Sequence, residues 1–190
     1  MLIVLFSKLV FAGDSNQFLN KSIEQKSPKI ALRMGFDASL ESVNSLESPL
    51  PYVCGQAYAS SRFSVEACGN GSGFLHQKDA PDTAHFRARY SVIQRGVQRS
   101  DWAVDVGTGI AEYQLGADKL GFSFGKAERG QREAAGPEAT LSLTGRRWLS
   151  EIGYGTMDVT VGGAYVAGAP VVLGGSVFQQ FGSISFGVGF

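Results

Sequence analysis

Few side chains in this chain of 190 residues could carry out acid–base or nucleophilic chemistry. His76 and His85 are its only histidines, and a catalytic histidine needs a nucleophile or a carboxylate within hydrogen-bonding reach. Ser91 lies too far along the same expected strand from His85, because a strand rises about 3.3 Å per residue. Neither histidine lies in a sequence pattern for zinc. The sequence therefore predicts no catalytic residue, no metal site and no cofactor.

The two cysteines, Cys54 and Cys68, are placed symmetrically about Ser61. A hairpin that turns at residues 60–62 would set them opposite one another, at the short cross-strand separation that a disulfide tolerates. In an exported protein we expect a disulfide rather than a metal pair, since no further ligands accompany the cysteines. In a cytosolic protein the same two residues would be free thiols.

Apolar and polar residues alternate along most of the chain, as in strands with one apolar face. The 25 glycines favour many closely spaced strands and turns over helices. Strands are expected at residues 29–37, 84–94, 101–110, 120–124, 139–143, 148–154, 159–167 and from about 176 onward. Residues 41–82 are interpreted as one long excursion that contains the cystine hairpin. This gives eight strands, or ten if the hairpin joins the barrel wall.

The polar faces of these strands combine glycine and serine with charges of both signs. A narrow barrel needs small residues where side chains crowd, and charges removed from water need opposite partners. We therefore expect a polar network in the barrel interior. Its predicted members are Arg33, Asp37, Arg87, Arg89, Asp101, Asp105 and Glu151. The alternative is that these charges face solvent on a soluble protein, for which more lysine would be expected in the strands.

Residues 182–190 (GSISFGVGF) place Ile184, Phe186, Val188 and Phe190 on one face of a strand. This ending resembles the C-terminal strand of bacterial outer-membrane β-barrels, whose terminal Phe and alternating apolar residues are an assembly signal. The resemblance is to an architectural class rather than to a specific family. It implies an all-β fold, a closed antiparallel up-and-down transmembrane β-barrel in the bacterial outer membrane. The implied partners are the barrel-assembly machinery, outer-membrane lipid and lipopolysaccharide.

Residues 1–12 (MLIVLFSKLVFA) are apolar except for Ser7 and Lys8. Val10 and Ala12 are small residues at the two positions that a signal peptidase recognises. We expect a signal peptide at 1–12, a short periplasmic segment at 13–27 and the barrel at 28–190. The chain has 17 basic and 17 acidic residues, so there is no basic excess to attract nucleic acid.

Three functions follow as expectations. The first is a non-enzymatic outer-membrane protein with a structural role or with loops that bind lipopolysaccharide or an external ligand. The second is a membrane-embedded lipid-modifying enzyme, similar to a lipid A deacylase or acyltransferase, that would use His76 or His85. The third is a soluble secreted barrel with an apolar ligand inside.

Overall fold

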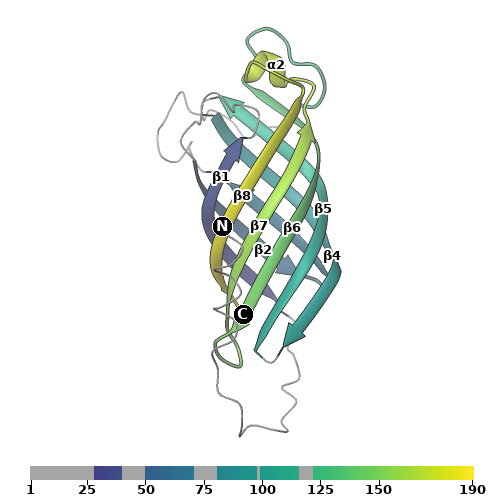
Figure 1. Cartoon of the computed structure of the whole chain (residues 1–190). Helices are drawn as coiled ribbons and strands as arrows, with labels where there is room; N and C mark the ends of the chain where they lie inside the picture. The colour runs from purple at the N-terminus through teal and green to yellow at the C-terminus, as the bar shows by residue number, and fades with distance from the viewer. Residues whose placement is uncertain (1–27, 40–49, 71–80, 98, 116–121) are drawn as a thin grey trace, which may run out of the picture.

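The computed structural model describes residues 28–39, 50–70, 81–97, 99–115 and 122–190. They form eight antiparallel strands that follow one another around a closed barrel, and the last strand pairs with the first (Figure 1). The predicted eight-stranded antiparallel barrel is thereby confirmed. The strands are β1 (Ile30–Ser39), β2 (Leu50–Tyr58), β3 (Phe63–Gly69), β4 (Pro81–Val97), β5 (Ser100–Leu115), β6 (Glu133–Trp148), β7 (Tyr154–Tyr165) and β8 (Phe178–Gly189).

The one-turn helix α2 (Ala169–Val172) lies between β7 and β8. No helix in the described ranges is long and apolar enough to cross a bilayer.

Two wall strands come from the segment at 41–82 that was interpreted as an excursion, and this part of the prediction is wrong. The cystine hairpin is β2 and β3, which pair with β1 and β4 and so belong to the barrel wall. The total nevertheless stays at eight rather than ten, because two other expected strands are not in the wall.

The expected strands at 120–124 and 148–154 are not strands of the wall: the described residues 122–124 and residues 149–153 belong to connections. Within 120–124, Phe124 makes only an isolated bridge to Ala135, and Gly125 follows with a φ of 98° that ends the extended backbone. Residues 149–153 form the turn between β6 and β7, in which the Ser150 hydroxyl oxygen accepts a hydrogen bond from the backbone N–H of Gly153 at 3.0 Å. A serine that bonds its own backbone in this way favours a turn over a strand.

The two ends of the barrel carry different connections. At one end β1 begins, β8 ends, and β2, β4 and β6 are followed by β3, β5 and β7; we term this the turn end. At the other end β1, β3, β5 and β7 end and β2, β4, β6 and β8 begin; we term this the loop end. In outer-membrane barrels short turns face the periplasm and longer loops face outward.

The outer wall is apolar and the inner wall is polar. Along β3, Phe63 and Val65 are exposed while Ser64, Glu66 and Cys68 are buried. The same alternation exposes large apolar side chains on every strand, among them Leu32, Val53, Phe86, Val106, Leu141, Val161 and Phe186. This is the reverse of a soluble barrel, because the apolar face points away from the interior and forms a continuous belt suited to lipid.

Aromatic residues near strand ends divide between the two faces. Tyr90, Trp102 and Tyr165 are exposed on the outer wall, where amphipathic rings settle at the headgroup level of a bilayer. Tyr113 and Tyr154, which also lie near strand ends, are instead buried inside.

Candidate functional site: the ion-paired lumen

Arg89 on β4 lies at the centre of the lumen and is 1% exposed. Its guanidinium donates to Glu66 at 2.8 Å, to Asp105 at 2.9 Å and to Asp158 at 2.7 Å. It also donates to the Thr144 hydroxyl at 3.0 Å. Because the acceptors come from β3, β5, β6 and β7, this one side chain links much of the barrel wall across its interior.

Arg33 on β1 joins the same cluster from the other side of the ring. Its guanidinium pairs with Glu66 and, at 2.8 Å, with Asp158. Room for this side chain depends on Gly187 of β8, where an added β-carbon would lie 2.8 Å from the Arg33 Cγ and closer still to the backbone of Leu32. A larger residue at position 187 would therefore displace both the arginine and the neighbouring strand.

A second layer lies toward the loop end. Arg87 donates to Glu138 at 3.0 Å, to Glu66 at 3.1 Å and to the Tyr52 hydroxyl at 3.3 Å. His85 Nδ1 lies 2.7 Å from a Glu138 oxygen, and its Nε2 lies 3.8 Å from an Asp37 oxygen. His85 is 1% exposed, so it is held between two carboxylates inside the barrel.

Toward the turn end the lumen contains a smaller pair. Arg146 Nε donates to Asp101 Oδ1 at 2.6 Å, and its guanidinium stacks over the Tyr58 ring at 5.7 Å from the centroid. Tyr154 and Trp148 pack side by side with ring centroids 4.9 Å apart. Charged and aromatic side chains therefore occupy the lumen from its middle to this end.

The Cys54–Cys68 disulfide predicted from the sequence is present and also faces the lumen. The two cysteines are directly opposite in the β2–β3 register, with Cα atoms 4.1 Å apart. Together with Glu66 they place potential metal-ligand atoms within 4.8 Å of one another. These atoms do not fit a metal, because both sulfurs are in the disulfide and the Glu66 carboxylate is engaged by arginines.

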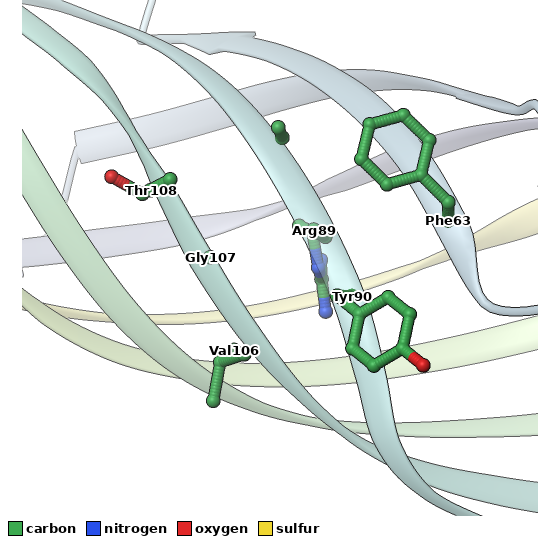
Figure 2. A pocket seen from close by; sticks show the side chains of 7 residues that line it. Phe63, Arg89, Tyr90, Val106, Gly107 and Thr108 are labelled. Carbon is green, nitrogen blue, oxygen red and sulfur yellow. The ribbon is translucent and has the colours of Figure 1, made fainter.

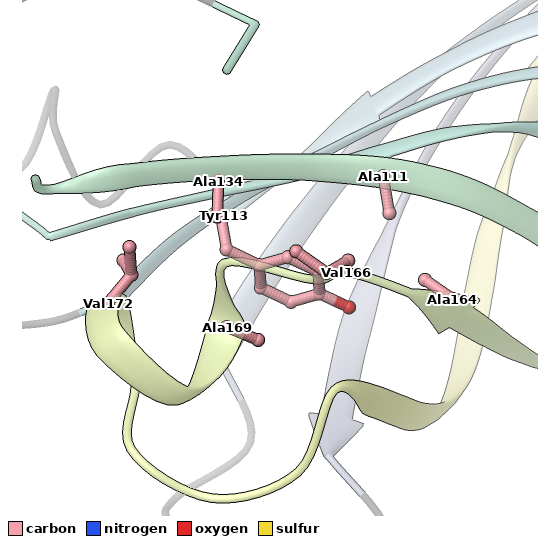
Figure 3. Close-up of a cluster of buried hydrophobic side chains, with 7 residues drawn as sticks. All are labelled: Ala111, Tyr113, Ala134, Ala164, Val166, Ala169 and Val172. Carbon is pink, nitrogen blue, oxygen red and sulfur yellow. The ribbon is translucent and has the colours of Figure 1, made fainter. Parts of the chain in front are cut away.

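A cluster of buried apolar side chains lies at the loop end, where the connection between β7 and β8 meets β5 and β6 (Figure 3). Tyr113 of β5 lies against Val166 and Ala169, which belong to the connection that carries α2 (Figure 3). We term this cluster the apolar plug; its members are Ala111, Tyr113, Ala134, Ala164, Val166, Ala169 and Val172. The lumen is thus ion-paired in the middle and apolar where it meets the longer connections.

The lumen brings most of the sequence-predicted interior residues together. Arg33, Arg87, Arg89, Asp101 and Asp105 are buried, and the Asp37 side chain is 12% exposed. The prediction that Glu151 lies in the interior is wrong. Glu151 is exposed in the turn between β6 and β7, because residues 149–153 do not continue a strand.

Four charged members of the network were missed by the sequence analysis: Glu66, Glu138, Arg146 and Asp158. Glu66 lies in the hairpin that was assigned to the excursion. Asp158 and Arg146 alternate with outward residues such as Val159 and Leu143, so a longer alternation pattern for β6 and β7 could have found them.

The predicted assembly-signal residues are all on the outer wall. Ile184, Phe186, Val188 and Phe190 are 38%, 54%, 56% and 57% exposed. The Phe190 backbone oxygen accepts hydrogen bonds from the backbone N–H groups of Lys29 and Ile30, both at 3.0 Å, and its N–H donates to Ile30. The backbone of Phe190 therefore contributes hydrogen bonds to the seam between β8 and β1.

A shallow hollow on the outer wall lies beside Gly107, between Phe63, Tyr90 and Val106 (Figure 2). An added β-carbon at Gly107 would point inward and lie 2.3 Å from the Thr140 hydroxyl oxygen. The lining that faces outward is apolar and aromatic and does not bring together the acid, base and nucleophile of a catalytic site.

No protein-family model matches this chain, and no curated protein matches it significantly by sequence. Solved structures with a similar course of the chain include the N-terminal β-barrel domain of Pseudomonas aeruginosa OprF, which is 9% identical with a TM-score of 0.49 over 87% of this chain and 100% of that chain. The outer membrane protein OprG of Pseudomonas aeruginosa is 13% identical with a TM-score of 0.47, over 89% of this chain and 97% of that chain. Ail, the attachment invasion locus protein of Yersinia pestis, is 11% identical with a TM-score of 0.42, over 86% of this chain and 98% of that chain.

The closed ring of eight strands, its apolar outer wall and its ion-paired lumen define the class of this protein. It is a small β-barrel of the outer-membrane type.

Proposed function

We propose that this protein is a non-enzymatic component of the bacterial outer membrane that acts through its loop end, as a structural or surface-binding protein. The observation that carries the proposal is the filled lumen. Arg89 on β4 links to four other strands across the interior, and the buried apolar plug lies at the loop end. An eight-stranded barrel is about filled by its own side chains, so solutes do not diffuse through it.

Lipopolysaccharide is the partner that the loop end suits. Lys126, Arg129 and Arg132 are exposed on the connection between β5 and β6. Phe122 of the same connection packs against Phe86 of the lipid-facing wall, with ring centroids 5.4 Å apart. The connection that carries these basic groups therefore adjoins the edge of the apolar belt, which is the level of the phosphates of an outer-leaflet lipid. Arginine is well suited to bind phosphate. An external ligand at the same loops is the alternative partner.

The lipid-modifying enzyme is less well supported. His85 is enclosed between Glu138 and Asp37 within the lumen, so lipid on the outer wall does not reach it. His76 lies outside the described residues. Mass spectrometry of lipid A from cells with and without the protein tests this alternative, because a deacylase or an acyltransferase would change the number of acyl chains.

Two measurements test the proposal itself. Full-length protein expressed in a Gram-negative host should fractionate with the outer membrane and migrate differently on a gel before and after heating, as folded barrels do. After reconstitution into planar bilayers it should give no steady pore current. Recovery in the soluble periplasmic fraction would contradict the membrane assignment, and a steady current that changes in an Arg89→Met variant would contradict a filled lumen.

Binding to lipopolysaccharide is tested with the folded protein in phosphatidylcholine vesicles. Replacing Lys126, Arg129 and Arg132 together by Gln should weaken the binding of added lipopolysaccharide, while a variant that keeps the three charges, with Lys126→Arg, Arg129→Lys and Arg132→Lys, serves as the matched control. Equal binding by both variants would contradict the proposal that these residues bind lipopolysaccharide.

A further inference from the structure

The turn end of the barrel carries a set of exposed basic residues. We term this set the basic rim; its members are Lys29, Arg62, Arg95, Arg99 and Arg147. Lys29 precedes β1, Arg62 lies between β2 and β3, and Arg147 is the penultimate residue of β6. Arg95 lies near the end of β4, and Arg99 directly precedes β5. The basic rim therefore follows the circumference from β1 to β6 and is not confined to one patch.

The basic rim lacks matching acidic groups in the described part of the chain. Glu151 is the one exposed acidic residue described at this end, and Asp101 is buried against Arg146. Within the described ranges no member of the rim forms an ion pair. At the loop end, by contrast, the basic residues of the β5–β6 connection alternate with Glu128 and Glu133.

Each part of the basic rim adjoins the apolar outer wall. Arg95 is directly opposite Trp102 in the β4–β5 register, and Trp102 is 42% exposed. Arg62 precedes the exposed Phe63, and Lys29 precedes the exposed Ile30. Long basic side chains next to a girdle of aromatic and apolar groups extend to the level of the lipid headgroups.

We propose that the basic rim binds the anionic headgroups of phospholipids in the membrane leaflet that faces the periplasm. The inference rests on the proposed membrane location. An acidic protein would contact only one side of a rim that extends around most of the barrel, whereas lipids surround the barrel and neutralise every member. Each basic residue near a membrane surface is attracted to anionic lipid by about 1 kcal/mol, or about fivefold in local lipid enrichment.

Trp102 gives a local probe of this contact. The chain has two tryptophans, so a Trp148→Phe variant leaves Trp102 as the only one, beside Arg95. This full-length variant is folded into phosphatidylcholine vesicles that contain either brominated phosphatidylglycerol or brominated phosphatidylcholine. The ratio of quenching by the two brominated lipids then reports which headgroup is enriched at the turn end, in the absence of any other protein.

We expect phosphatidylglycerol to quench Trp102 more strongly, and Arg95→Gln to reduce this preference by about fivefold at low salt. The control is Glu128→Gln, at an exposed residue of the loop end, which should leave the ratio unchanged. In the protein that keeps Arg95, added salt should lower the preference, because exposed charges are screened; this measurement does not depend on the folding of an arginine variant.

The outcomes separate the two proposals. If the protein folds in the vesicles but the two brominated lipids quench equally, or if salt and Arg95→Gln leave the ratio unchanged, binding of anionic headgroups by the basic rim is overturned while the membrane location stands. If the protein folds into no vesicle of either composition, the proposed membrane location is overturned together with it.

Discussion

Arg89 Nη2 on β4 lies 2.7 Å from Asp158 Oδ2 on β7, although the two residues are 69 positions apart in the chain. Both side chains are buried, and neither strand is a neighbour of the other in the sheet. The contact therefore crosses the lumen and depends on closure of the ring.

Removing the Arg89 guanidinium should destabilise the barrel strongly. An Arg89→Met variant leaves Glu66, Asp105 and Asp158 with fewer partners in the interior, and breaking a buried pair typically costs about 3–5 kcal/mol. Urea unfolding of the protein in vesicles, followed by the heat-modifiable band on gels, measures the loss. Arg95→Met is the control, since Arg95 is exposed at the turn end and should change stability by less than about 1 kcal/mol. Equal losses would show that the lumen network is not a major source of stability.

Leu141 lies in the middle of β6 and is 50% exposed on the outer wall. If this surface contacts the hydrocarbon core, Leu141→Arg should cost about 2–4 kcal/mol in the free energy of unfolding from vesicles. Leu149→Arg is a matched control, because Leu149 is 66% exposed in a turn at the barrel end. A similar stability of the two variants would argue that the outer wall does not contact lipid.

The disulfide should be intact in exported protein and resistant to reduction while the barrel is folded, because both cysteines are buried in the lumen. Replacing Cys54 and Cys68 together by Ala should lower stability by about 3 kcal/mol, as expected for a closed loop of about 15 residues. Mass spectrometry after alkylation without reductant detects the bond, and urea unfolding measures its contribution. Two alkylated thiols in protein from the cell envelope would contradict the prediction.

Phe190 combines a side chain on the outer wall with backbone hydrogen bonds to Lys29 and Ile30. Deleting it should lower folding into vesicles more than Phe190→Ala does, because only the deletion removes the seam hydrogen bonds. In cells, both changes should reduce the heat-modifiable fraction in outer membranes if the assembly machinery reads the aromatic ring. Normal membrane levels of Phe190→Ala would instead restrict its role to the backbone of the seam.

The fold was predictable because a wall with one lipid-facing side imposes alternation on each strand. Ile30 to Phe36 and Trp102 to Val106 show this pattern clearly, and both segments lie in the wall as expected. The expected strands at 120–124 and 148–154 were wrong because local chemistry overrides alternation there. Ser150 bonds its own turn, and Gly125 has a positive φ, so neither connection could be distinguished from a strand by periodicity alone.

The lumen could be predicted only in part. Alternation assigns Arg33, Arg89 and Asp105 to one face, but it does not say which carboxylate each arginine meets. Those partners depend on the stagger of the strands, and stagger is set by pairing around the whole ring. The apolar plug depends in the same way on how Val166 and Ala169 fold back over Tyr113.

The seam between β1 and β8 has a kinetic consequence. All other strand pairs join neighbours in the sequence, so only this pair must bring together the two ends of the barrel chain, which is the slow kind of contact in folding. Arg33 enters from β1 and pairs with Asp158 of β7 across β8. An open sheet would therefore hold Arg33 and Asp158 apart within the bilayer, and its lifetime would be limited by the cost of those unpaired charges.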